Sequence, residues 1–104
     1  VMHFAYFDAG TRTIRYAVRD STGQWSARSD IDTSAPEMGH FLSLKLDRFG
    51  RPNVAYFDGT HGDLRFAKFD GADWNIQTVD SRGSVGLYPS LLLDANDRPS
   101  IAYY

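Results

Sequence analysis

The chain has 104 residues and no cysteine, and its eleven basic side chains are balanced by thirteen acidic ones. The length suits one domain, and the absence of cysteine excludes disulfides and thiolate metal ligands. No basic stripe suits a phosphate backbone, and no run approaches the roughly 18 apolar residues of a membrane span. We therefore expect neither a nucleic-acid partner nor a membrane partner.

A short motif near the start of the chain is repeated further along it. Ala-Tyr-Phe-Asp at 5–8 returns at 55–58 and begins again as Ala-Tyr at 102–103. Offsets of about 50 residues are typical of one four-stranded propeller blade. We therefore divide the single domain 1–104 into repeat units at approximately 1–39, 40–86 and a partial unit at 87–104.

Each complete unit is predicted to contain short antiparallel strands. In the second unit they span approximately residues 41–47, 53–58, 63–69 and 74–79, separated by Gly, Pro, Asp and Asn clusters of hairpin length. No segment has an apolar period near 3.6, so no helix is expected.

The apolar pattern distinguishes between all-β architectures. Both faces are apolar in 54–57 and in 90–93, whereas a two-sheet sandwich would alternate apolar with polar residues. The inner strands should thus be covered on both sides, as in a radial stack of blades. The outermost strand, 74–79, is more polar and should be more exposed.

On these motifs the chain resembles a bacterial β-propeller repeat family. The resemblance is carried by 52–58, 64–67, 70–74, 79–80 and 90–94, and it covers nearly the whole chain. It implies an all-β propeller fold, often in extracellular proteins. It implies no single activity, because one fold serves many functions.

About two blades cannot form a propeller by themselves. Propellers usually close with 4–8 blades, so the ring needs either the remaining blades of a parent chain or further copies, three for six blades or four for eight. The strands near 2–8 and 100–104 are redundant copies that compete for equivalent places in a ring. This redundancy favours a fragment of a larger propeller over a self-assembling homo-oligomer, and both remain open.

Repeated aspartates, such as Asp8, Asp47, Asp58 and Asp94, could suggest the paired carboxylates of a glycosidase. Their recurrence at equivalent positions instead favours turns in which the carboxylate accepts backbone N–H groups. No catalytic residue, metal ligand or cofactor is expected.

The best candidate for a ligand site is the loop face of the predicted propeller. The loops at 8–13, 33–40, 58–63 and 81–88 should gather there. The candidate ligand-binding residues share this face and are Arg12, His40, Asp58, His61, Asp63 and Tyr88.

The favoured function is a non-catalytic, lectin-like binding or scaffold module for carbohydrates or peptides. One alternative is a fragment of a polysaccharide-active hydrolase or lyase whose acids come from other blades. Another is a repeat protein selected for folding and assembly, with no ligand.

Overall fold

The structure is a computed structural model that describes residues 2–8, 10, 13–32, 38–58, 62–81 and 89–102. These residues form strands and turns without a helix, so the all-β prediction is confirmed. Within them, no helix is long and apolar enough to cross a membrane. The strands are β1 (Met2–Asp8), β2 (Thr13–Arg19), β3 (Trp25–Asp32), β4 (Met38–Leu46), β5 (Pro52–Asp58), β6 (Asp63–Phe69), β7 (Trp74–Asp80), β8 (Ser90–Leu93) and β9 (Pro99–Ala102).

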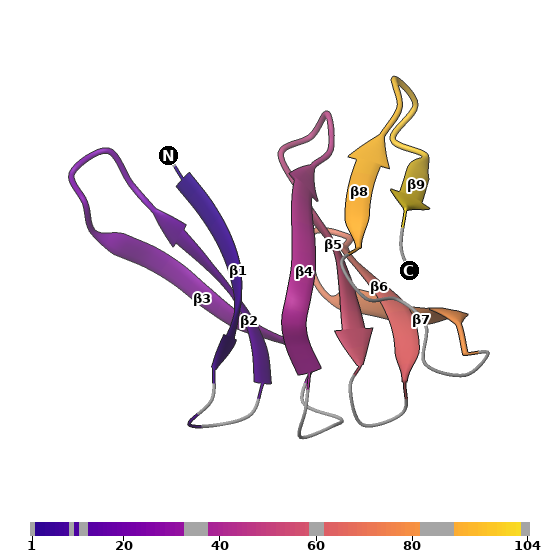
Figure 1. Cartoon of the computed structure of the whole chain (residues 1–104). Helices are drawn as coiled ribbons and strands as arrows, with labels where there is room; N and C mark the ends of the chain where they lie inside the picture. Colours follow the sequence, from indigo (N-terminus) through magenta and orange to yellow (C-terminus); the bar gives the residue numbers. More distant parts are fainter. Residues whose placement is uncertain are drawn as a thin grey trace.

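The strands form three antiparallel sheets in which each strand pairs with its neighbour in sequence. The first sheet has the order β1-β2-β3, the middle sheet β4-β5-β6-β7 and the third sheet β8-β9. Figure 1 shows the three sheets following one another, with β4 between the first sheet and β8. None of the three closes on itself. The four strands predicted for the second unit are all present, although β4 begins at Met38, before the predicted start at residue 41.

The same turn follows β4 and β8. The carboxylate of Asp47 accepts hydrogen bonds from the N–H groups two and four residues later, both at 2.9 Å. The carboxylate of Asp94 does the same at 2.8 and 2.9 Å. At the fourth position of each turn φ is positive, 76° at Gly50 and 60° at Asp97. The turn role predicted for Asp47 and Asp94 is therefore confirmed.

The hydrophobic core lies between the sheets, in two clusters on opposite faces of the middle sheet. On one face, Val54 and Tyr56 of β5 pack with Ile14 and Ile31 of the first sheet. On the other face, the neighbouring residue Ala55 packs with Leu91 of the third sheet and with Phe66 of β6. Successive residues of a strand point to opposite faces, so β5 is covered on both sides.

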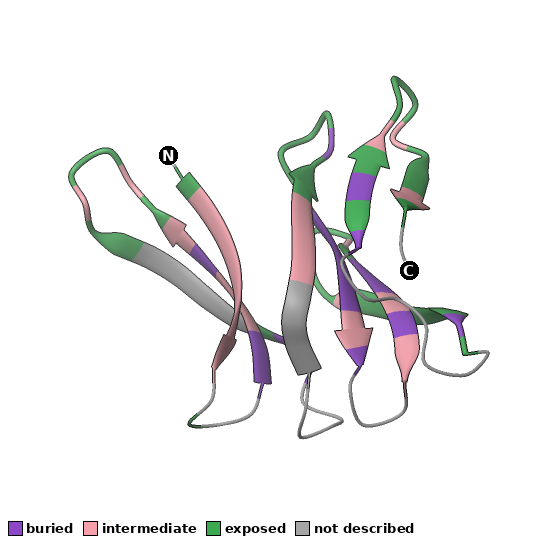
Figure 2. Cartoon of the chain, viewed as in Figure 1, coloured by how far each residue is buried: buried purple, intermediate pink, exposed green. Residues whose placement is uncertain are grey.

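Within the middle sheet, burial is greatest in β5 and falls through β6 to β7. Figure 2 shows β5 mostly buried and β7 mostly exposed. The predicted exposure of the outermost strand is thus confirmed, and it extends to the apolar side chains of Ile76 and Val79, which are 42% and 43% exposed. Ile31, which holds the place of Val79 in the first sheet, is only 4% exposed. The middle sheet covers Ile31, whereas the two-stranded third sheet leaves Val79 uncovered.

Candidate functional site between the sheets

A buried polar cluster joins the first sheet to the middle sheet. The Tyr56 hydroxyl donates to Asp32 Oδ2 at 2.5 Å, and Arg65 Nη1 donates to the same oxygen at 3.0 Å. Arg65 Nη2 binds Asp58 Oδ2 at 2.8 Å. The side chains of Asp32 and Asp58 are 2% and 0% exposed. The cluster therefore links β3 to β5 and β6 through charges that are removed from water.

Strand register explains why these residues meet. Tyr56 on β5 pairs directly with Arg65 on β6, and Asp58 lies two residues further along β5. Residues directly opposite each other and residues two apart on one strand share a face of the sheet. Asp32 is the last residue of β3, in register with the buried Ile14, and it meets this face where the first sheet packs on it.

The pKa values of two groups in the cluster, the Tyr56 phenol and the Arg65 guanidinium, are raised, so both stay protonated at ordinary pH. Burial, reinforced by the hydrogen bond to Asp32, raises the pKa of the Tyr56 phenol well above its usual value near 10. Burial opposes the charge of Arg65, but the hydrogen bond to Asp32 and the charge of Asp58 outweigh it, so the pKa of Arg65 is also raised. A general acid or base works best with a pKa near the operating pH. This arrangement is suited to holding two sheets together rather than to moving protons.

The first sheet contains the same constellation with one difference. Arg15 Nη1 binds Asp8 at 3.1 Å, as Arg65 binds Asp58. Tyr6 pairs with Arg15 in register, as Tyr56 pairs with Arg65. The second carboxylate on Arg15 is Asp30 of the same sheet, at 2.9 Å, and it is 51% exposed. The polar groups of the first sheet are therefore arranged like those of the middle sheet. The difference is that the second carboxylate on Arg15 is exposed and belongs to the same sheet, whereas the one on Arg65 is buried and comes from the neighbouring sheet.

The predicted ligand residues are brought together only in part. Asp58 and Asp63 pair at the ends of β5 and β6. The Asp58 carboxylate is buried and bound to Arg65, and its backbone oxygen accepts the Gly62 N–H at 2.8 Å. Asp63 is half-buried.

The other four predicted ligand residues cannot be placed on the site. Arg12, His61 and Tyr88 lie outside the described residues. His40 lies in strand β4, but its side chain is not among those that the structure describes. In Figure 1, β1 and β5 end, and β2, β4 and β6 begin, at one edge of the molecule. The strand ends that flank the predicted loop face therefore share an edge, and the ligand site itself stays a prediction.

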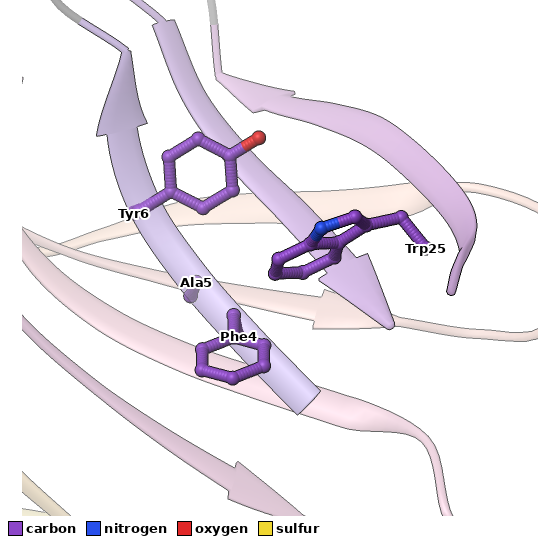
Figure 3. A pocket seen from close by; sticks show the side chains of 4 residues that line it. All are labelled: Phe4, Ala5, Tyr6 and Trp25. Atoms are coloured by element: carbon purple, nitrogen blue, oxygen red, sulfur yellow. The ribbon is translucent and has the colours of Figure 1, made fainter. Parts of the chain in front are cut away.

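The outward face of the first sheet carries an apolar pocket of about 370 Å³. Figure 3 shows its lining, with Phe4, Ala5 and Tyr6 from β1 and Trp25 from the start of β3. The rings of Phe4 and Trp25 lie 5.3 Å apart at 56°. The pocket thus combines an aromatic wall with the Tyr6 hydroxyl.

In the hairpins that begin at Asp20 and Asp70, an aspartate carboxylate binds the backbone of the turn that follows it. Asp20 Oδ1 accepts the N–H groups of Thr22 and Gln24 at 2.9 and 3.0 Å. Asp70 Oδ1 accepts two backbone N–H groups, at 2.9 and 2.8 Å. These carboxylates hold their own turns.

The contact of Asp32 with Tyr56 and Arg65 was not predicted from the sequence. Its signal is a tyrosine and an arginine that recur at an offset of 50 inside apolar runs, as Tyr6 and Arg15 do. Polar side chains at repeated, buried positions need partners. That requirement points to carboxylate partners, which Arg15 finds within its own sheet and Arg65 finds partly in the neighbouring one.

Among the described residues, no group of three or more His, Cys, Asp or Glu side chains is arranged to hold a metal ion. Comparison with known proteins adds no assignment, because no family model, curated protein or solved structure matches the chain.

Proposed function

We propose that this chain is a β-propeller segment that works as a non-catalytic scaffold or binding module, either by self-assembly or within a larger propeller. The observation that carries the proposal is the contact of Asp32 with Tyr56 and Arg65, a buried connection between successive sheets. The covering of β5 on both faces supports it further, because a blade in a radial stack lies between two others.

The repeat explains how such a module would be extended. The first and middle sheets each have a Tyr and an Arg in register and an Asp at the end of the outer strand, namely Tyr6, Arg15 and Asp32 in the first sheet and Tyr56, Arg65 and Asp80 in the middle sheet. Identical units that stack through the same contact form rings or arrays. A ring of this kind displays several equivalent loops, which favours multivalent binding of sugars or peptides.

The binding part is tested with immobilised chain probed against arrays of glycans and short peptides. We expect a ligand whose binding is lost in Asp63→Asn, at the start of β6, and kept in the control Asp73→Asn, in the exposed hairpin at the other end of β6. Equal binding by both variants would contradict the loop face as the site. Failure of every probe to bind would contradict the binding role and leave the scaffold role.

A further inference from the structure

Taken together, the first and third sheets contain a counterpart of every strand of the four-stranded middle sheet. The middle sheet has the order β4-β5-β6-β7. By sequence equivalence, β8 and β9 correspond to β4 and β5, whereas β1, β2 and β3 correspond to β5, β6 and β7. In the described part of the chain, the third sheet therefore supplies an inner pair and the first sheet an outer triplet. Placing β1 beside β8 would reproduce the complete order.

The sequences of β1 and β9 are interchangeable at the decisive positions. Ile101-Ala102 of β9 corresponds to Phe4-Ala5 of β1, and each pair is followed by tyrosine. In the third sheet Leu91 pairs with Ile101 and Leu92 pairs with Ser100. The same register would place Phe4 opposite Leu91 and His3 opposite Leu92.

The aromatic pocket on the first sheet is the uncovered counterpart of a surface that is covered in the middle sheet. Its lining residues Phe4, Tyr6 and Trp25 correspond to Val54, Tyr56 and Trp74, all of which pack against the first sheet. From the first sheet, the ring of Tyr16 meets that of Trp74 at 5.7 Å and 68°. In the repeat, Phe66 corresponds to Tyr16, so Phe66 of a neighbouring sheet would meet Trp25.

Charge complementarity selects the same partner. Asp80 ends β7 as Asp32 ends β3, and the two are in register with Leu64 and Ile14 respectively. Next to Asp80, the exposed Val79 corresponds to the covered Ile31. The outer half of the middle sheet therefore carries a carboxylate, Asp80, which is 8% exposed in the single chain, beside the exposed Val79, in the arrangement that the first sheet presents to the middle sheet.

We propose that a second copy of this chain docks its first sheet onto the middle sheet, with β1 replacing β9 beside β8. In this interface Asp80 of one copy accepts hydrogen bonds from Tyr6 and Arg15 of the other, and Phe66 packs on Trp25. Each such contact adds a complete four-stranded sheet, made of β8 of one copy and the first sheet of the other, to the complete middle sheet that each chain already has. The inference rests on the proposed scaffold function and names the partner as another copy of the chain.

Disulfide trapping tests the strand exchange directly, because the chain has no cysteine of its own. His3→Cys and Leu92→Cys are purified separately, mixed and oxidised. Residues directly opposite in an antiparallel pair have Cα atoms about 4.5 to 5.5 Å apart, which suits a disulfide. We expect a covalent His3→Cys/Leu92→Cys heterodimer. The control mixture of Leu92→Cys with Ser21→Cys, in the exposed β2–β3 turn, should give at least tenfold less.

A double-mutant cycle tests the polar contact without new cysteines. Tyr6→Phe and Asp80→Asn should each weaken assembly about tenfold, and the double variant should be little weaker than either one, as expected for hydrogen-bonded partners. Additive effects would overturn the contact.

The two proposals fail in different ways. An assembly that forms without the His3→Cys/Leu92→Cys heterodimer would overturn the strand exchange and leave the scaffold function standing. A folded chain that stays monomeric at every concentration would overturn both the exchange and self-assembly.

Discussion

The buried carboxylate of Asp32 should stabilise the fold far more than the exposed carboxylate of Asp30. Both bind an arginine at nearly the same distance, Asp32 to Arg65 at 3.0 Å and Asp30 to Arg15 at 2.9 Å. Their side chains differ in exposure, 2% against 51%. The two substitutions to alanine therefore compare one interaction in two environments.

The magnitude follows from the groups that each substitution leaves behind. Asp32→Ala leaves the buried Tyr56 hydroxyl without the carboxylate that accepts its hydrogen bond. It also removes one of the two carboxylates that bind Arg65, which keeps its ion pair with Asp58 at 2.8 Å. Removing one partner from a buried pair costs about 3 to 5 kcal/mol. Because Asp58 remains, we expect about 3 kcal/mol for Asp32→Ala. An exposed pair contributes about 0 to 1 kcal/mol, so Asp30→Ala should cost less than about 1 kcal/mol.

Urea unfolding at pH 7 and one fixed protein concentration, followed by tryptophan fluorescence, measures both variants. The midpoint should move strongly for Asp32→Ala and barely for Asp30→Ala, with unchanged slopes. Losses of equal size, both below about 1 kcal/mol, would refute the view that the buried cluster holds the first two sheets together.

Three further predictions follow from burial and charge. Burial and the hydrogen bond to Asp32 raise the pKa of Tyr56, so its contribution to stability is complete below about pH 10 and is lost above it. Tyr56→Phe should therefore flatten the fall in unfolding free energy between pH 9 and 11. A smaller slope should remain from Tyr16, because burial also raises the pKa of that residue. Backbone hydrogen bonds lower the pKa of Asp70 to about 2, so its contribution is present above about pH 4 and disappears towards pH 2; thermal unfolding over this range should lose that dependence in Asp70→Ala, and an unchanged acid profile would contradict it. Ile31→Ala should destabilise the dilute, unassembled chain by about 2 to 4 kcal/mol and Val79→Ala by less than about 1 kcal/mol, because the side chains are 4% and 43% exposed; similar losses in urea unfolding would contradict the assignment of covered and uncovered faces.

Strands were predictable where composition and turns marked them. The predicted strand at 63–69 agrees with β6 in full, because polar turns bound an apolar run on both sides. The start of β4 was placed too late, at residue 41. There the ladder with β5 continues past a register shift, from Leu42 opposite Tyr56 to Met38 opposite Asp58. Periodicity does not show such an irregularity, because it depends on the partner strand.

The candidate site was less predictable than the fold. Asp32 and Tyr56 are 24 residues apart and meet only because two sheets pack face to face. The repeat pattern marks the residues but gives no approach distance between sheets. Asp58 illustrates the result: its place at a strand end suggested a ligand site, whereas its carboxylate is buried and bound to Arg65.

The mass of the assembled protein in solution tests the central claim most directly. Sedimentation equilibrium over a range of concentrations should give three or four times the chain mass of 11.7 kDa, since about two blades per chain would then close a ring of six or eight. A well-folded monomer of 11.7 kDa at every concentration would contradict the claim that these sheets stack as blades completed by further copies.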